Sequence, residues 1–145
     1  MYIKLVSAII VIIVLFFGGS FIEFYQDKDI RSGYSLFKEG KYSLAINQLK
    51  PFAIEGDTHS RLLIAKFYAL GLNSQKDKVE ALKWLACTSN NCIKGKGELS
   101  IGLEFVHATL TNADISEACY WIQKSQDKGY APAIIQYNQL CRVKE

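Results

Sequence analysis

The sequence has few of the residues and motifs from which catalytic and metal sites are built. It contains only two histidines, His59 and His107, and neither has a serine, cysteine or aspartate at a recognisable catalytic spacing. It has no glycine-rich phosphate loop, paired-acid motif or H-E-x-x-H pattern, and its four cysteines lack the C-x₂-C spacing of zinc sites. We interpret both histidines as surface or packing residues. We expect no enzyme activity, no catalytic residue, no cofactor and no metal.

Charge of one sign is not concentrated anywhere along the chain. The formal net charge is +3 at pH 7, and basic residues alternate with acidic ones, as at 27–31 and 76–80. Such alternation is typical of a solvated helical surface, whereas nucleic-acid binding requires a basic stripe or a known module. We therefore expect no nucleic-acid partner.

One long hydrophobic run is present, at residues 5–22, and it contains no charged residue. At ~1.5 Å of rise per residue, such a helix is about 27 Å long, close to the hydrocarbon thickness of a bilayer. The run exceeds the ~7–15 apolar residues of a cleaved signal, so we predict that 1–26 is a signal anchor crossing the membrane through 5–22. The alternative is a signal peptide with Gly18 and Ser20 at its cleavage site. No cysteine stands directly after the run, which excludes a bacterial lipoprotein anchor.

Basic residues and cysteines indicate opposite orientations in the membrane. Four basic residues lie between 28 and 41, against Lys4 and the amino terminus before the run, so the positive-inside rule alone would leave the body in the cytoplasm. The cysteine pairs described below favour an oxidising compartment. We expect a single-pass inner-membrane protein whose repeat domain, 27–145, lies in the periplasm. The alternative is secretion to the periplasm after signal cleavage.

A short phrase recurs three times at nearly equal intervals. It reads AINQL at 45–49, ALKWL at 81–85 and ACYWI at 118–122, so its first alanines are 36 and then 37 residues apart. A period of roughly 34 to 40 residues is typical of helical-hairpin solenoids, in which no unit can bury its apolar face alone. We predict an all-α fold, an α-solenoid of about three and a half antiparallel hairpins preceded by the N-terminal hydrophobic helix.

Apolar residues at three- and four-residue steps predict the helices of these hairpins. The first helix begins near Ile30 and is broken at Gly40, and the second begins at Tyr42, with a kink or local end expected at Pro51. Helix N-caps are expected at three polar residues, Thr58, Asp77 and Asp114. The last helix, 131–141, carries a proline in its first turn and is expected to cap the array.

Small and large apolar residues recur at matching positions of the units. Ala45, Ala81 and Ala118 are expected to let the two helices of a hairpin approach closely. Trp84 and Trp121 are expected to fill the gap between one hairpin and the next, because a tryptophan buries a large apolar area.

Several stretches resemble the Sel-one-like repeats, which are relatives of the tetratricopeptide repeats. They are Leu-Gly at 70–71, D-x-V-E-A-L-K-W-L at 77–85, D-x-x-E-A-x-x-W at 114–121 and D-K-G-Y-A-x-A at 127–133. The family's Gly-x-Gly loop is missing after Gly71, and His107-Ala108-Thr109 stands where the family has a glycine. The resemblance covers about 33–139 and implies helical hairpins that bind proteins.

The four cysteines are predicted to form two disulfides. The midpoint between Cys119 and Cys141 is residue 130, at the expected turn Gly129-Tyr130, so the two thiols should face each other across an antiparallel hairpin. Cys87 and Cys92 flank a short polar turn and are also within bonding reach. The resemblance supports this pairing, since some secreted Sel-one-like proteins have a disulfide in each hairpin. The alternative is buried free thiols in a cytoplasmic protein.

These features predict a membrane-tethered protein–protein interaction module, an adaptor or regulator of a bacterial envelope. A first alternative is an immunity protein that neutralises a secreted antibacterial effector, a role that the resemblance allows. A second is a β-lactamase-like or peptidoglycan-fragment hydrolase, although no serine nucleophile motif is present. The partner is expected to be a secreted effector or an envelope protein. Exposed contact residues are expected on the first helix of each hairpin, at Tyr34, Lys38, Arg61, Lys66, Tyr68, Glu98, Glu104 and Tyr137.

Overall fold

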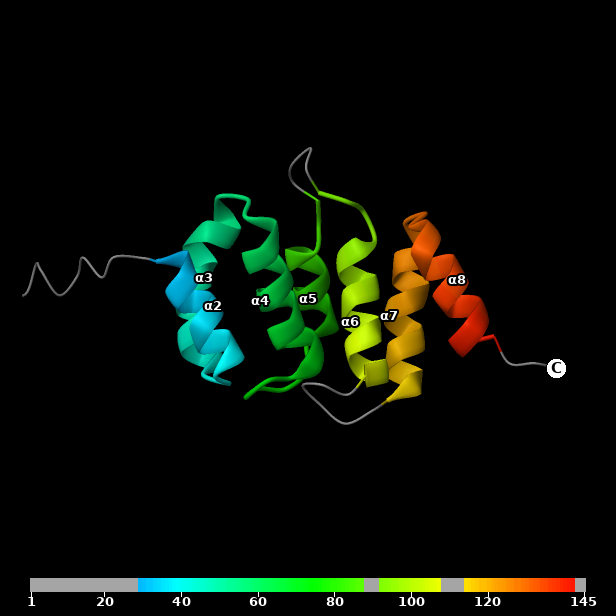
Figure 1. Cartoon of the computed structure of the whole chain (residues 1–145), viewed down its shortest axis with the longest axis horizontal. Coiled ribbons are helices and arrows are strands. Elements are labelled where there is room, and N and C mark those ends of the chain that lie inside the picture. Colours follow the sequence, from blue (N-terminus) through cyan, green and yellow to red (C-terminus); the bar gives the residue numbers. More distant parts are fainter. Residues whose placement is uncertain (1–28, 88–91, 108–113, 143–145) are drawn as a thin grey trace, which may run out of the picture.

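The structure, a computed structural model, describes residues 29–87, 92–107 and 114–142. These residues form seven α-helices and no β-strand, so the all-α prediction is confirmed. The helices are α2 (Ile30–Lys38), α3 (Tyr42–Ile54), α4 (Thr58–Leu70), α5 (Lys78–Trp84), α6 (Lys96–His107), α7 (Ile115–Asp127) and α8 (Ala131–Leu140). Figure 1 shows them spread along the long axis of the molecule, with α2 and α3 at one end and α8 at the other.

Consecutive helices pair most closely. The most extensive contacts are between α2 and α3, between α4 and α5, and between α6 and α7, and we refer to these pairs as the first, second and third hairpins. The first hairpin joins the second through α3 and α4, and α7 joins α8 in the same way. The second and third hairpins meet more sparsely, through α4 and α6. This sparse joint is where the cavity described below is found.

Aspartates cap the N-termini of four described helices, α2, α4, α5 and α7. The Asp77 and Asp114 carboxylates accept hydrogen bonds from the backbone N–H groups of Glu80 and Glu117, at 2.8 and 3.0 Å, so both predicted N-caps are confirmed. The predicted cap at Thr58 is wrong, because the preceding Asp57 caps α4 and Thr58 is its first residue. A carboxylate forms stronger hydrogen bonds with the free N–H groups of a first turn than a hydroxyl does, because those bonds are charge-assisted.

Helix α3 continues past Pro51 to Ile54, so the local end expected there is not found. A proline in a helix removes one N–H donor but keeps its own carbonyl acceptor. The Pro51 carbonyl accepts the Glu55 N–H at 3.0 Å, and one more turn therefore forms before the helix ends. The expected break at Gly40 is confirmed, with a left-handed φ of +76° that glycine adopts without strain.

Small residues occupy buried positions in each hairpin. Ala45, Ala81 and Ala118 are all fully buried. Gly102 on α6 approaches α7 so closely that an added Cβ would lie 2.7 Å from the Ile122 side chain. Bulkier residues at these points would push the paired helices apart.

The two tryptophans have different surroundings. Trp121 is fully buried and stands edge-on to Tyr120, in agreement with the core role expected of it. Trp84 is only partly buried, and its indole N–H donates to the Glu80 carboxylate at 3.1 Å. Trp84 also lines the cavity between the second and third hairpins, so it does not fill that gap completely.

The hydrophobic run at 5–22, and with it the predicted anchor at 1–26, lies outside the described residues. Among the helices that the structure describes, none is both long and apolar enough to cross a bilayer.

Candidate functional site

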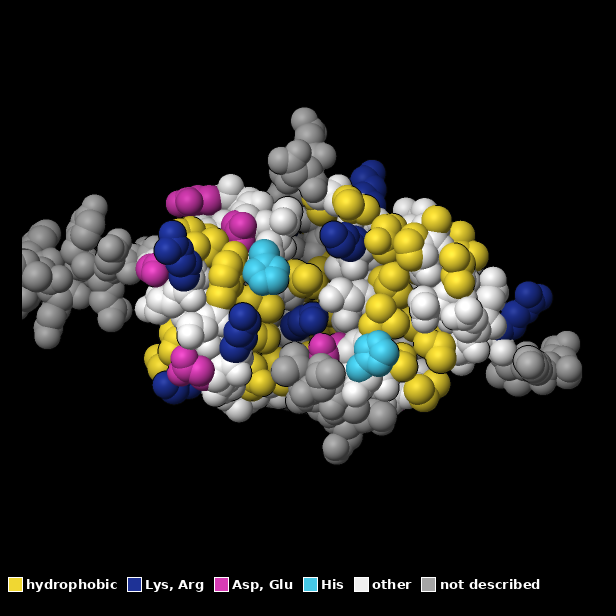
Figure 2. Space-filling model, viewed as in Figure 1, with side chains coloured by type: hydrophobic (Ala, Val, Ile, Leu, Met, Phe, Trp, Pro, Cys, Tyr) yellow, Lys and Arg dark blue, Asp and Glu magenta, His cyan; other side chains and the backbone are white. Residues whose placement is uncertain are grey.

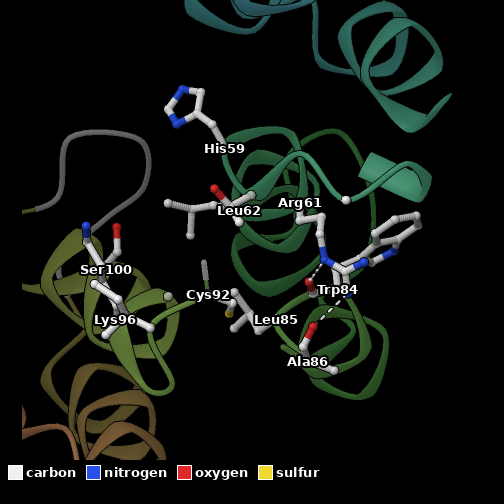
Figure 3. A pocket seen from close by; sticks show the side chains of 13 residues that line it. His59, Arg61, Leu62, Trp84, Leu85, Ala86, Cys92, Lys96 and Ser100 are labelled. Atoms are coloured by element: carbon white, nitrogen blue, oxygen red, sulfur yellow. Dashed lines mark hydrogen bonds between the residues drawn. The ribbon is translucent and has the colours of Figure 1, made fainter. Parts of the chain in front are cut away.

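A cavity of about 250 Å³ lies between the second and third hairpins. Helix α4 contributes His59, Arg61 and Leu62, and the end of α5 contributes Trp84 and Leu85. The opposite wall comes from the segment that leads into α6 and from the first turns of α6, with Ile93, Lys96 and Ser100. Figure 3 shows Lys96 and Ser100 across the cavity from Leu62, with His59 at its edge.

The lining combines apolar walls with basic groups. Leu62, Leu85 and Ile93 supply apolar surface, and Ile93 is 56% exposed. Arg61 and Lys96 are the charged lining residues, and no aspartate or glutamate is among the lining residues that the structure describes. Polar groups that become buried need hydrogen-bond partners, and basic side chains form their strongest hydrogen bonds with anionic groups. The cavity is thus suited to a ligand with both apolar and acidic parts.

Arg61 is held by the end of the neighbouring helix. Its Nε donates to the Trp84 carbonyl at 3.0 Å, and a terminal nitrogen donates to the Ala86 carbonyl at 2.8 Å (Figure 3). The Trp84 carbonyl belongs to the C-terminal end of α5, the negative end of the helix dipole, where carbonyls lack helical N–H partners, and the Ala86 carbonyl lies just beyond it. The guanidinium also lies 5.9 Å from the centre of the Trp84 ring. Arg61 therefore fixes one wall of the cavity.

Two ion pairs join the second hairpin to the third. Lys66 on α4 pairs with Glu104 on α6 at 3.4 Å, and Lys78 on α5 pairs with Glu117 on α7 at 2.8 Å. The Lys78 ammonium also lies 4.1 Å from the centre of the Tyr120 ring. These polar contacts join the two hairpins where their helices make few contacts with one another.

Both predicted disulfides are present. Cys87 pairs with Cys92 and Cys119 pairs with Cys141, with Cα–Cα distances of 5.4 and 5.5 Å. The second pair joins α7 to the end of α8 across the turn at Gly129, as the midpoint argument predicted. Cys92 also lines the cavity, so the first disulfide ties the segment before α6 to the end of α5.

The expectation that eight contact residues are exposed is wrong for two of them. Glu98 is 1% exposed and Glu104 is 9% exposed, because each extends inward to a lysine. Glu98 pairs with Lys128 at the end of α7, and Glu104 pairs with Lys66. Buried carboxylates are tolerated only when they are paired in this way. Both residues therefore hold helices together.

The other six predicted contact residues are accessible to different degrees. Lys38 is exposed, and five are partly buried: Tyr34, Arg61, Lys66, Tyr68 and Tyr137. Of these six, only Arg61 lines the cavity. On the face shown in Figure 2, the two histidines are separate, one over the start of α4 and one at the end of α6.

Asp57, Tyr34 and Ser60 form a polar cluster at the start of α4. The Tyr34 hydroxyl and the Ser60 N–H donate to one Asp57 oxygen, at 2.9 and 2.7 Å. Burial raises the pKa of the Asp57 carboxyl, but the hydrogen bonds from Ser60 and Tyr34 and the nearby His59 outweigh it, so the net pKa is lowered. Burial is the main reason that the pKa of Tyr34 is raised.

This cluster caps the N-terminus of α4. The Ser60 side chain is fully buried, so its hydroxyl is not accessible to a substrate, and the Asp57 carboxylate is occupied by its two donors. No group of three or more histidine, cysteine or acidic side chains in the described ranges could hold a metal ion.

Sequence reasoning did not predict the cavity. His59, Leu62, Ile93 and Lys96 come from two different hairpins, and no motif joins them along the chain. Among the lining residues, Arg61 is the one that the sequence predicts as a contact residue, and it was expected to be exposed. Comparison with protein-family models, with curated proteins and with solved structures found no match to this chain.

Proposed function

We propose that this chain is a membrane-tethered protein-binding module that uses the cavity between its second and third hairpins. The cavity carries this proposal, because it combines exposed apolar surface with basic groups in a recess supported by a disulfide, an arginine clamp and two ion pairs. A recess on a rigid scaffold, with apolar walls and a few placed polar groups, is the usual form of a binding site.

In this proposal the body is a short α-solenoid of about three and a half Sel-one-like hairpins. The three tightly paired helix hairpins, the spread of helices along the long axis in Figure 1 and α8 as a half-unit support this arrangement. So does the 36- to 37-residue spacing of the repeated phrase.

The proposed location is the periplasmic side of an inner membrane, with residues 5–22 as the anchor. The apolar run supports the anchor, and the two disulfides support an oxidising compartment, because they seldom persist in a reducing cytosol. The partner would then be an envelope protein or a secreted effector.

The test is cross-linking of the tagged full-length chain in intact cells of its host, followed by purification from solubilised membranes. We expect one protein at near-stoichiometric yield in the membrane fraction. A partner enzyme that is inhibited in the complex would identify an immunity protein, and a non-catalytic envelope protein would identify an adaptor. Recovery of the chain alone, or of the chain in the soluble cytosolic fraction, would contradict the proposal.

A further inference from the structure

Two basic side chains of the cavity, Lys96 and Arg61, indicate the charge of the ligand that it would bind. Lys96 is exposed on one wall and the Arg61 guanidinium stands on the other, and neither forms an ion pair with any acidic side chain that the structure describes. The described lysines of the same joint differ, because Lys66 and Lys78 are both paired with glutamates. Positive charge at the cavity is therefore left uncompensated, while the charges beside it are neutralised.

Asp57 is the acidic residue that interacts with the edge of the cavity, and its carboxylate is already engaged in hydrogen bonds. Asp57 interacts electrostatically with His59, but its carboxylate accepts hydrogen bonds from the Ser60 N–H and the Tyr34 hydroxyl. The Arg61 donors are directed at backbone carbonyls, which satisfy hydrogen bonds but carry no net charge. An incoming anion would meet the full charge of Lys96 and the long-range field of Arg61.

The apolar part of the cavity has room for one large side chain. The whole cavity measures about 250 Å³, more than the volume of a leucine or phenylalanine side chain, and Leu62, Leu85 and the 56%-exposed Ile93 contribute apolar surface to its lining. A single apolar anchor seated in a pocket with charges at its rim is a common arrangement at protein interfaces.

We propose that the cavity binds a partner segment in which one large apolar side chain is flanked by acidic residues. This inference rests on the proposed function, because it names the partner chemistry of the same cavity. The apolar side chain enters between Leu62 and Ile93, and the acidic residues lie against Lys96 and the cationic edge near Arg61. Charge complementarity steers the segment to the cavity and fixes its direction.

The test is selection of random linear peptides, displayed on phage, on the full-length chain kept in detergent. We expect the enriched sequences to carry aspartate or glutamate on both sides of a large aliphatic or aromatic residue. The affinity of a selected peptide should fall as salt is raised, because rim charges are screened. Enrichment of neutral or basic sequences would overturn the inference and leave the proposed function standing.

Two variants locate the binding. Lys96→Glu should weaken the selected peptide by about fivefold or more, whereas Lys50→Glu, the same charge change on exposed α3 surface, should leave the affinity unchanged. Ile93→Ser should weaken it as well by removing an apolar wall, and Ile93 is exposed enough to be replaced without harm to folding. Equal binding by wild type, Lys96→Glu and Ile93→Ser would overturn the cavity as the site.

Peptide selection and cross-linking together distinguish failure of this inference from failure of the proposed function. If cross-linking captures a partner but no acidic peptide is selected, the function stands and this inference fails. If neither a peptide nor a partner is found, both fail.

Discussion

Arg61 on α4 donates a hydrogen bond from its Nε to the backbone carbonyl of Trp84, 3.0 Å away at the end of α5. A second bond, to Ala86 at 2.8 Å, extends the contact past the last turn. The α5 helix has only seven residues, which is too short to be stable on its own. An arginine from the preceding helix completes its C-terminal end, and this pairing shapes the cavity wall.

Replacement of Arg61 by alanine should therefore destabilise the fold by about 2–3 kcal/mol, because several carbonyls would lose a charged donor. Arg61→Lys should recover only part of that loss, since one ammonium cannot reach the same carbonyls. Urea unfolding measures both effects. Arg31→Ala, at an exposed position on α2, is the matched control and should change stability by less than about 0.5 kcal/mol. A loss no larger than that of the control would show that the clamp contributes nothing.

The ion pair between Glu98 and Lys128 should contribute more to stability than the partly exposed position of Lys128 suggests. Lys128→Met would leave the Glu98 carboxylate, which is 1% exposed, without its partner, at a cost of about 3–5 kcal/mol. The double variant Glu98→Gln with Lys128→Met should recover part of that loss, because the uncompensated charge is removed. Thermal unfolding of both single variants and the double variant completes the cycle. Simple additivity would contradict a direct pair.

Asp57 should make the fold sensitive to acid. Its folded pKa is lowered by the hydrogen bonds from Ser60 and Tyr34, so it contributes stability above the unfolded pKa of about 3.9. That contribution is lost as the pH falls from about 5 through the folded pKa. Asp57→Asn keeps a capping oxygen without the charge, so its free energy of unfolding should depend less on pH in this window. Parallel pH profiles of the two proteins would contradict this assignment.

The two disulfides should contribute unequally to stability. The Cys119–Cys141 bond closes a separation of 22 residues and the Cys87–Cys92 bond closes one of five. Loop-closure entropy then predicts about 3 kcal/mol for the first and about 2 kcal/mol for the second. Paired alanine variants, one for each bond, can be compared by urea unfolding. A larger loss from the Cys87 and Cys92 pair would show that local packing, and not chain entropy, sets the order.

Local sequence patterns predicted the helices and several of their ends, although α4 is capped by Asp57 and not by Thr58, and α3 continues past Pro51. Asp77 and Asp114 were identified as caps because a capping side chain acts on residues two or three positions away. The Cys119–Cys141 bond followed from the symmetry of an antiparallel hairpin about its turn. Each of these features depends on residues close in sequence or related by one turn.

Contacts between hairpins could not be predicted in this way. Glu98 and Glu104 look like exposed acidic residues on a helix, and only lysines that are distant in sequence explain their burial. Arg61 was expected to be a contact residue because nothing in the sequence shows that its donors reach α5. The cavity itself depends on how far two hairpins stand apart, which is a property of packing and not of any motif.

The most direct test of the account is site-specific photocross-linking in living cells. A photoreactive amino acid is placed at Ser100, which lines the cavity, or at Lys50, which is exposed on α3. We predict that the Ser100 probe forms one dominant adduct with a partner protein and that the Lys50 probe does not. Equal labelling from both positions, or no adduct from Ser100, would contradict the claim that this cavity is where the protein binds its partner.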